Sequence, residues 1–440
     1  MKVVVPFLVL LLAGCAPQSA INVAPATTVA PAPRAFPAVQ AAVDAAVREG
    51  RVNGITVAVG VGDDPTTFIS AGELTIGTGI EATQDSLWRI YSMTKPITAV
   101  AAMILVDEGK LDLDQPLSEF FPEYKNVRVL IDPDNGLETR PATGPITIRH
   151  LLTHTSGLGY AIGGKSPAVD AMNKAGILPF QWSRATEAAV RTARPTTLQD
   201  FAKRAATAGL VADPGTRFSY SMSLDVLAAV VEKAAGMPFE TFLQQRLFTP
   251  LGMNSTYWQV PASEVGRFAT NYLSVPGALP SAPASAKFSP ADPAASSVYL
   301  DAPSFPYGGA GLVSSAADYD RFLHMLANDG TLNGVRVLRP QTARLAKSNL
   351  MPKGVLYRGL GPVVTKEPAG FGAGAMVTTA ETDSLGRKRG TYGWDGAAGT
   401  HAWVDTVRRV RVTTMINNPM AAAITEEIDK AVAADLGVAR

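Results

Sequence analysis

The stretch that decides the fold reads Tyr91-Ser92-Met93-Thr94-Lys95-Pro96. A serine and a lysine three residues apart face the same side of a helix, so the amine can reach the hydroxyl. Apolar residues recur with helical spacing from Ile97 to Leu105, and Gly109 is a plausible helix end. Pro96 is tolerated because few intrahelical hydrogen bonds are lost so near a helix start. The stretch therefore predicts a helix with a buried apolar stripe that opens at Ser92.

Ser92 and Lys95 have two interpretations. At the positive end of an apolar helix, Ser92 could act as a nucleophile, because a developing negative charge is stabilised there. Alternatively, Ser92 only caps the helix and Lys95 is solvated. A Ser-x-x-Lys spacing is expected about once by chance in a chain of this length. The rest of the chain has to decide between the two.

Composition restricts the function classes. The chain has 440 residues, of which 18% are charged and 47% hydrophobic, and its formal net charge is +1. We expect a large core arranged as two lobes. No basic run or acidic tail points to nucleic acid as a partner. Four histidines and one cysteine leave little material for a metal site, so neither a metal nor another cofactor is expected. His150 and His154 are interpreted as structural, because Leu151 stands where a zinc-protease helix needs glutamate.

The first 15 residues have the pattern of an export signal. Lys2 supplies a positive charge, and residues 3–12 form an apolar run too short to span a bilayer. The run ends in Leu12-Ala13-Gly14-Cys15, which resembles a bacterial lipobox, whose cysteine carries the lipid. We therefore predict a lipoprotein-type signal peptide over 1–15 with Cys15 as the lipidation site. The alternative is an ordinary signal peptide that is cleaved elsewhere, with Cys15 incidental.

Residues 16–37 are rich in proline and alanine, and they predict an extended tether. If the usual bacterial sorting applies, Ala16 after the cysteine favours the outer membrane. We expect an exported lipoprotein that faces the periplasm and touches the membrane only through its lipid anchor.

The remaining elements alternate between helical and strand-like patterns, which favours a sheet covered by helices. Helices are predicted over 38–48, from 92, within 198–236 and over 421–434. Strands are predicted over 55–59, 67–70, 375–377, 391–394, 401–404 and 410–416. A proline-rich segment over 275–306 reads as a long ordered loop or a flexible flap.

Residues 159–166 match the P-loop expression for nucleotide binding letter for letter. A P-loop needs a buried strand before it and a helix after it, so that backbone N–H groups converge on phosphate. Here a short helix is predicted before the stretch, and Pro167 interrupts the segment after it. We therefore expect no nucleotide partner.

Six stretches in order resemble the serine β-lactamase and penicillin-binding protein superfamily, most closely its class C β-lactamase-like esterases and D-peptidases. They are Ser92–Lys95, His150–Leu158, Pro214–Ser221, Pro250–Met253, Gly308–Ser315 and Trp394–Gly396. The resemblance implies an α/β (α+β) fold of the β-lactamase/transpeptidase type, with an antiparallel sheet flanked by helices. One domain over 38–440 would contain a sheet lobe (about 38–146 and 307–440) and an inserted, mainly helical lobe (about 147–306). The active site would lie between the lobes.

The resemblance also assigns roles to residues. Ser92 would be the nucleophile, and Lys95, desolvated at the helix start, its base. Tyr220 resembles the tyrosine of the second motif, which would shuttle the proton to the leaving group. The alternative for Tyr220 is a core aromatic with a satisfied hydroxyl. The backbone N–H groups of Ser92 and Ala397 would hold the oxyanion.

Two departures from the family pattern bear on the substrate. Met222 replaces an asparagine that contacts a substrate amide, and Trp394 replaces a lysine that faces a substrate carboxylate. The Trp-x-Gly form with Gly396 resembles the esterases of the superfamily. Met222, Trp394 and Gly396 are therefore expected to contact substrate. Trp394 could instead pack beneath its strand.

The sequence thus predicts a serine hydrolase that cleaves small neutral carboxylic esters through an acyl-enzyme on Ser92. One alternative is a β-lactamase or D-peptidase that acts on cell-wall peptides or β-lactams. The other is a non-catalytic envelope binding protein with the same fold. The expected partner is a small-molecule ester or amide.

Overall fold

A computed structural model describes residues 1–2, 4, 32–162, 164–279, 282–360, 363–364, 368–419 and 422–438. The chain divides into two units, residues 1–32 and 33–440. Cys15 lies outside the described residues, so its predicted lipidation and the signal peptide stay predictions. In the part that the structure describes, no helix is both long and apolar enough to cross a bilayer.

The larger unit begins inside the predicted tether. Phe36 is only 3% exposed and packs with the cluster that α1 (Pro37–Arg48) forms with β1 and α13. The carbonyl of Arg34 accepts a hydrogen bond of 2.6 Å from Thr67 Oγ1. The prediction that the tether runs to residue 37 is therefore wrong at its C-terminal end, because an aromatic side chain and a helix start are already buried there.

Both ends of the chain contribute to a seven-stranded antiparallel sheet, which confirms the predicted sheet. Its order is β13-β14-β15-β16-β17-β1-β2. The strands are β1 (Gly54–Val61), β2 (Thr67–Gly72), β13 (Ala369–Phe371), β14 (Met376–Thr378), β15 (Tyr392–Asp395), β16 (His401–Asp405) and β17 (Val410–Ile416). Strand β1 lies between β17 and the edge strand β2, and it pairs with β17 from Ile55 opposite Ile416 to Val61 opposite Val410.

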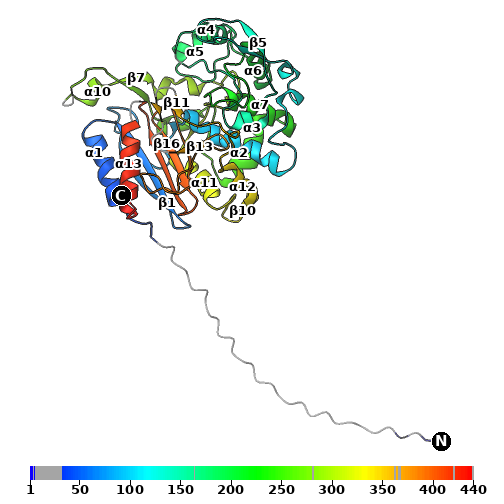
Figure 1. The fold of residues 1–440 in the computed structure, drawn as a ribbon. Coiled ribbons are helices and arrows are strands. Elements are labelled where there is room, and N and C mark those ends of the chain that lie inside the picture. Colours follow the sequence, from blue (N-terminus) through cyan, green and yellow to red (C-terminus); the bar gives the residue numbers. More distant parts are fainter. Residues whose placement is uncertain are drawn as a thin grey trace. The chain divides into compact units, whose positions relative to one another are not determined.

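Helices cover both faces of this sheet. On one face α1 and α13 (Ala422–Asp435) lie side by side, as Figure 1 shows in blue and red. Ile55, Val57 and Val59 of β1 pack with these two helices, whereas Ala58 joins the other core. Alternation along a strand therefore divides β1 between two apolar cores. Helix α11 (Ala316–Ala327) contacts β1, β16 and β17.

The chain between β2 and β13 carries the other helices and short strand pairs. The helices are α2 (Thr94–Asp107), α3 (Ile148–Leu152), α4 (Pro167–Lys174), α5 (Arg184–Val190), α6 (Leu198–Ala205), α7 (Ser223–Ala235), α8 (Phe239–Leu243), α9 (Thr249–Leu251), α10 (Ala284–Lys287), α11 and α12 (Pro340–Ala346). The strands are β3 (Trp88–Arg89) with β8 (Val313–Ser314), β4 (Arg128–Leu130) with β5 (Thr139–Pro141), β6 (Asn271–Ser274) with β7 (Phe288–Asp292), β9 (Thr331–Leu332) with β10 (Val335–Arg336), and β11 (Gly359–Leu360) with β12 (Val363–Val364).

Helix α2 is the centre of the larger core. Every residue from Thr94 to Leu105 is buried, so the expected apolar stripe extends around the whole helix. A helix that is apolar on all sides belongs inside a core. Helices α7 and α12 both contact α2. Lys95 is buried with the rest of this helix, which is unfavourable unless its amine is hydrogen-bonded.

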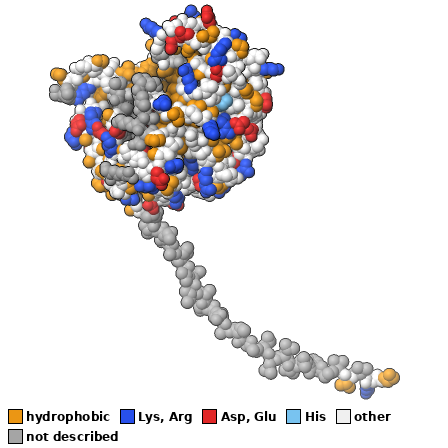
Figure 2. Space-filling view, in the orientation of Figure 1, with side chains coloured by type: hydrophobic (Ala, Val, Ile, Leu, Met, Phe, Trp, Pro, Cys, Tyr) orange, Lys and Arg blue, Asp and Glu red, His pale blue; other side chains and the backbone are white. Residues whose placement is uncertain are grey.

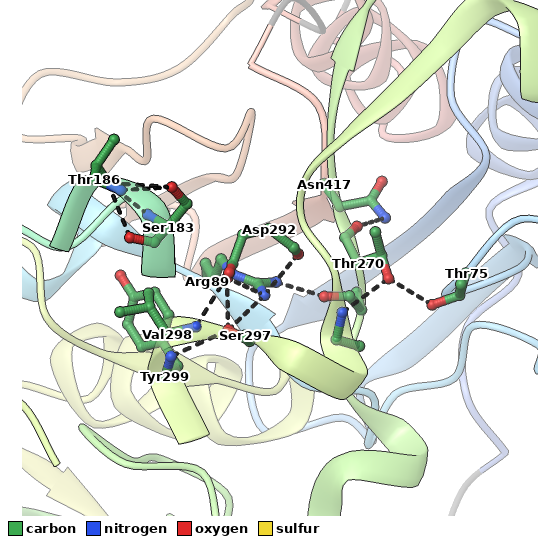
Figure 3. Close-up of polar contacts among 12 residues, drawn as sticks. Thr75, Arg89, Ser183, Thr186, Thr270, Asp292, Ser297, Val298, Tyr299 and Asn417 are labelled. Atoms are coloured by element: carbon green, nitrogen blue, oxygen red, sulfur yellow. Dashed lines mark hydrogen bonds and ion pairs between the residues drawn. The ribbon is translucent and has the colours of Figure 1, made fainter. Parts of the chain in front are cut away.

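A buried ion pair ties the proline-rich segment to the strand that leads into α2. Arg89 of β3 donates from Nε to Asp292 Oδ2 at 2.8 Å, and both side chains are 1% exposed. Ser297 Oγ and the backbone N–H of Val298 also donate to Asp292, as Figure 3 shows. The described residues from 282 to 306 are therefore fixed against the body through Asp292, as the ordered-loop interpretation expects.

Charges of both signs are spread over the surface. Figure 2 shows Lys and Arg side chains interspersed with Asp and Glu on the visible face. The net charge of +1 agrees with this mixture.

Candidate active site

Ser92 lies in a tight turn just before α2. The turn Tyr91–Met93 is 3₁₀-helical and α2 itself begins at Thr94, so the helix opens two residues later than predicted. Tyr91 has φ of 38°, a left-handed conformation that costs a non-glycine residue on the order of 1–3 kcal/mol. The Ile90 N–H donates to Leu312 O at 3.1 Å, which fixes the entry to the turn. Ser92 is thus held at the N-terminal end of a buried helix.

Two of the predicted side chains donate hydrogen bonds to Ser92. Tyr220 Oη lies 2.8 Å from Ser92 Oγ, and Lys95 Nζ lies 3.1 Å from it. Lys95 is fully buried and also donates to Gly309 O at 2.7 Å. Within the described residues, no carboxylate oxygen lies within the 4.0 Å ion-pair distance of Lys95 Nζ. The structure therefore brings Ser92, Lys95 and Tyr220 together around one hydroxyl oxygen.

Tyr160 is a residue of this cluster that sequence reasoning missed. Its Oη accepts a hydrogen bond of 3.4 Å from Lys95 Nζ, and its ring lies edge-on to the Tyr220 ring with centroids 5.2 Å apart. Burial raises the pKa of Tyr160 well above its usual value, so the hydroxyl keeps its proton. Tyr160 lies inside the P-loop-like stretch over 159–166, and no local pattern marks its contact with Lys95, which is 65 residues away.

A glycine connects Lys95 to a buried carboxyl group. The Gly309 N–H donates to Asp225 Oδ1 at 2.8 Å, while the Gly309 carbonyl accepts from Lys95. A Cβ at Gly309 would lie 2.5 Å from Asp225 Oδ2, so no larger residue fits there. Burial raises the pKa of Asp225 to about 7, although the nearby Lys95 opposes this shift. The segment Gly308–Ser315, noted from the sequence, thus links α2 to α7.

His154 holds the backbone on both sides of Tyr220. Its carbonyl accepts from the Ser219 N–H at 2.8 Å, and its Nδ1 accepts from the Ser221 N–H at 3.2 Å. The imidazole and Tyr220 rings are 4.7 Å apart. Because Nδ1 accepts from a backbone N–H, the ring proton is assigned to Nε2. Burial, with a smaller contribution from Lys95, lowers the pKa of His154 well below 6.5, so the ring is neutral.

The predicted oxyanion groups line one common cavity. Ser92 and Ala397 both line it, and neither backbone N–H has an acceptor among the described residues. Gly396 is buried, and a Cβ there would lie 2.4 Å from Ile90 O. Gly396 therefore lets the turn between β15 and β16 approach the Ser92 turn. Its observed contribution is close backbone packing rather than a side-chain surface for substrate.

Two cavities adjoin the catalytic cluster. The smaller has a volume of about 400 Å³ and the larger about 890 Å³, and both share Tyr160 and Ile162. Ser92 and Ala397 line the smaller cavity, whereas Tyr220 lines the larger. Among the described residues, no group of three or more His, Cys, Asp or Glu side chains could hold a metal ion.

The structure corrects the prediction for Met222. Its side chain is fully buried in the core, because the residue immediately precedes α7 and packs with that helix. Trp394 is 7% exposed and packs against Tyr220, with ring centroids 5.7 Å apart, and against Phe371 at 5.1 Å. Neither Met222 nor Trp394 belongs to the walls of the two cavities. The alternative for Trp394, packing beneath its strand, agrees with this burial.

Comparison with known proteins finds a family and several related enzymes. A family model described as Beta-lactamase matches residues 39–434. Protein Rv1367c of Mycobacterium tuberculosis (strain ATCC 25618 / H37Rv) is 35% identical over 335 residues, or 74% of this chain and 76% of that protein. Esterase EstB of Burkholderia gladioli is 31% identical over 393 residues, or 85% of this chain and 88% of EstB. The structure of EstCE1, a hydrolase with promiscuous acyltransferase activity, matches with a TM-score of 0.70 at 25% identity, covering 90% of this chain and 98% of that chain.

Proposed function

The chain belongs to the beta-lactamase family, and on that premise we propose that it is a serine hydrolase that cleaves small carboxylic esters through an acyl-enzyme on Ser92. The observation that carries the proposal is the convergence of Tyr220 and Lys95 on Ser92 Oγ, at 2.8 and 3.1 Å. A serine hydroxyl needs such neighbours to lose its proton. Similarity to esterase EstB over 85% of the chain supports esters as the substrate class.

Acylation starts with attack of Ser92 Oγ on the ester carbonyl carbon. The hydroxyl proton passes to the Lys95 amine, Tyr220 gives its phenolic proton to the departing alcohol oxygen as the C–O bond breaks, and the proton held by Lys95 then returns to Tyr220. The N–H groups of Ser92 and Ala397 stabilise the negative oxygen of the tetrahedral intermediate. Water then attacks the acyl carbon and gives a proton to Lys95 and Tyr220. These groups return a proton to Ser92 Oγ as its bond to the acyl carbon breaks, and the carboxylic acid is released.

Neutral esters suit this site better than β-lactams. By the family motif that the sequence resembles, Trp394 stands where a lysine would be expected to face a substrate carboxylate, and a lost contact to a carboxylate forfeits about 1.5–3 kcal/mol. The test compares kcat/KM of the full-length protein for 4-nitrophenyl butyrate and for nitrocefin. We expect the ester to be better by at least about a hundredfold. A better nitrocefin rate would replace the esterase with a β-lactamase, and turnover of neither would favour a binding protein.

The finer expectation is an exported lipoprotein of the periplasmic side of the outer membrane, anchored through Cys15. It is supported by Leu12-Ala13-Gly14-Cys15 after a short apolar run. Cells that express the chain are fed a labelled fatty acid, with Cys15→Ser as the matched variant. Label and membrane retention should both disappear in that variant. Lipid still attached to Cys15→Ser would contradict the anchor.

A further inference from the structure

We infer that the two cavities divide the substrate, so that the acyl group occupies the smaller cavity and the alcohol occupies the larger one. This inference rests on the proposed ester hydrolysis and names the substrate class. The substrate would be an ester of a medium-sized apolar acid with a larger alcohol that carries hydrogen-bond acceptors.

The position at which the leaving group must be protonated decides which cavity holds the alcohol and which holds the acyl group. Tyr220 donates to the departing alcohol oxygen, and Tyr220 lines only the larger of the two cavities. The alcohol oxygen has to lie within hydrogen-bond reach of that phenol, about 2.6–3.2 Å. The carbonyl oxygen has to face Ser92 and Ala397, which line only the smaller cavity. The acyl chain, attached to the same carbon, is then directed into the smaller cavity.

The smaller cavity is apolar. Its wall contains Tyr91, Ile162, Leu178, Phe180, Trp182, Val190 and Ala310. Arg194 is the charged member of the wall, but its Nε pairs with Glu187 at 2.9 Å, and its Nη2 donates to Phe180 O at 2.8 Å. Both side chains of this pair are about 5% exposed. A neutralised guanidinium leaves a hydrocarbon surface that favours an alkyl or aromatic acyl group by about fourfold per buried methylene.

The volume of the smaller cavity limits the size of the acyl group. At roughly 30 Å³ for each heavy atom, the share of a water molecule in the liquid, 400 Å³ corresponds to about thirteen heavy atoms, enough for a hexanoyl or decanoyl group. An acetyl group would leave most of this surface uncovered. Trp182 forms one side of the cavity and stacks on Tyr91 with centroids 5.9 Å apart. Trp182 and Val190, both half-buried, are therefore the residues that limit acyl length.

The larger cavity has a mixed wall, in which charged and polar side chains stand beside apolar ones. Arg140 pairs with Asp213, whereas Arg217 has no carboxylate partner among the described residues and donates to Val211 O at 2.9 Å. A guanidinium carries five N–H groups, and among the described residues Arg217 donates to the Val211 carbonyl, so its other donors can face a ligand. This argues for an alcohol that presents oxygen acceptors, such as a hydroxy acid, rather than a plain alkyl alcohol.

Two ester series separate the cavities. The first keeps 4-nitrophenol as leaving group and varies the acid from acetate through hexanoate to decanoate. The second keeps acetate as the acid and compares phenyl acetate with the acetate ester of 4-hydroxybenzoate, and the release of acetate is measured.

We expect hexanoate to exceed acetate by about tenfold or more in kcat/KM, and Val190→Phe to lower that ratio about tenfold. Trp182→Ala should raise the decanoate-to-hexanoate ratio.

Arg217→Ala should lower the ratio of the hydroxybenzoate ester to phenyl acetate about tenfold and leave the acyl series unaltered. Val407→Phe is the matched control for Val190→Phe, since Val407 is 67% exposed and lines neither cavity. It should alter neither series. The melting temperature of each variant is measured beside the kinetics, so that only folded variants are compared. Trp182→Ala provides an acyl-side result if Val190→Phe does not fold.

The outcomes distinguish this inference from the proposed function. Acyl-side variants that change the second series, or an Arg217→Ala effect on the first, would overturn the assignment of the cavities while the esterase stands. The same holds if esters are cleaved but acyl length has no effect. A folded protein that cleaves no ester at all would overturn the proposed function, and this inference with it.

Discussion

Two clusters of ionisable side chains balance charge differently. The Ser92 cluster consists of Ser92, Lys95, Tyr160 and Tyr220, and the His401 cluster of His401, Asp395, Asp429 and Arg387. Among the described residues, Lys95 donates only to hydroxyl and carbonyl oxygens, those of Ser92, Tyr160 and Gly309. His401 of β16 lies between two carboxylates: Nε2 is 3.1 Å from Asp429 Oδ2 of α13, and Nδ1 bonds Asp395 of β15.

Burial alone would lower the pKa of His401, yet the charges of Asp429 and Asp395 raise it to about 10. Asp429 also pairs with Arg387 at 3.1 Å. The His401 cluster therefore pairs its cations with carboxylates and joins β15, β16 and α13. Lys95, by contrast, forms no ion pair among the described residues and is hydrogen-bonded to the hydroxyl of Ser92. The comparison predicts that damage to the Ser92 cluster lowers turnover and damage to the His401 cluster lowers stability.

The largest effect is expected from Lys95→Met. Methionine fills a similar volume without the amine, so the core should stay packed while the base is lost. We expect kcat for a nitrophenyl ester to fall by about two to four powers of ten. Thermal unfolding measured beside the kinetics is the control. Near-normal turnover with an unchanged melting curve would mean that Lys95 has been given the wrong role.

Two tyrosines within the Ser92 cluster give a sharper contrast. Tyr220 donates to Ser92 Oγ at 2.8 Å, whereas the Tyr160 hydroxyl accepts from Lys95 at 3.4 Å and has no hydrogen bond to Ser92. Tyr220→Phe should therefore lower kcat by about two to four powers of ten, and Tyr160→Phe by about one. Each change removes a single oxygen, so the pair is matched in size. Equal losses in the two variants would show that the proton route is not confined to Tyr220.

A smaller loss of turnover is expected at His154, which positions Tyr220 without touching Ser92. His154→Phe keeps a ring beside Tyr220 but removes the acceptor for the Ser221 N–H. We expect kcat to fall about tenfold with KM little changed, measured on the same ester. His154→Asn, which restores an acceptor, should recover part of the loss. A fall in Tm with unchanged kcat would make His154 a purely structural residue.

The smallest effect on turnover should come from His401→Gln, whose consequence is stability. The folded-state pKa of about 10 exceeds the unfolded value of about 6.5, so the stabilisation is complete below pH 6.5 and is lost as pH rises toward 10. We expect the variant to lose about 2–3 kcal/mol of unfolding free energy at pH 6 and much less at pH 10. Urea denaturation at both pH values measures this. A constant difference would contradict a charged His401.

Local sequence patterns predicted much of the fold and the chemical centre. The predicted strands over 55–59, 67–70 and 410–416 each fall within β1, β2 and β17, because alternation and β-branched residues are local signals. Ser92, Lys95 and Tyr220 could be found because six short motifs in order resemble one family, and the match over residues 39–434 confirms that family.

The failures concern contacts between distant segments. Met222 is expected from its motif position to contact substrate. Whether an apolar side chain there points to the cavity or to the core depends on α7 packing, which no local pattern states. Tyr160 joins Lys95 across 65 residues. The burial of Trp394 has a practical consequence, because a Trp394→Lys variant would bury a charge and is a poor probe of substrate choice.

The central claim is that Ser92 alone becomes acylated, and active-site labelling tests it most directly. The full-length protein is treated with a fluorophosphonate probe, digested, and mapped by mass spectrometry, with Ser92→Ala as the matched variant. The account predicts one modified peptide, which carries Ser92, and no label in Ser92→Ala. Label on another serine, or undiminished label in Ser92→Ala, would contradict it.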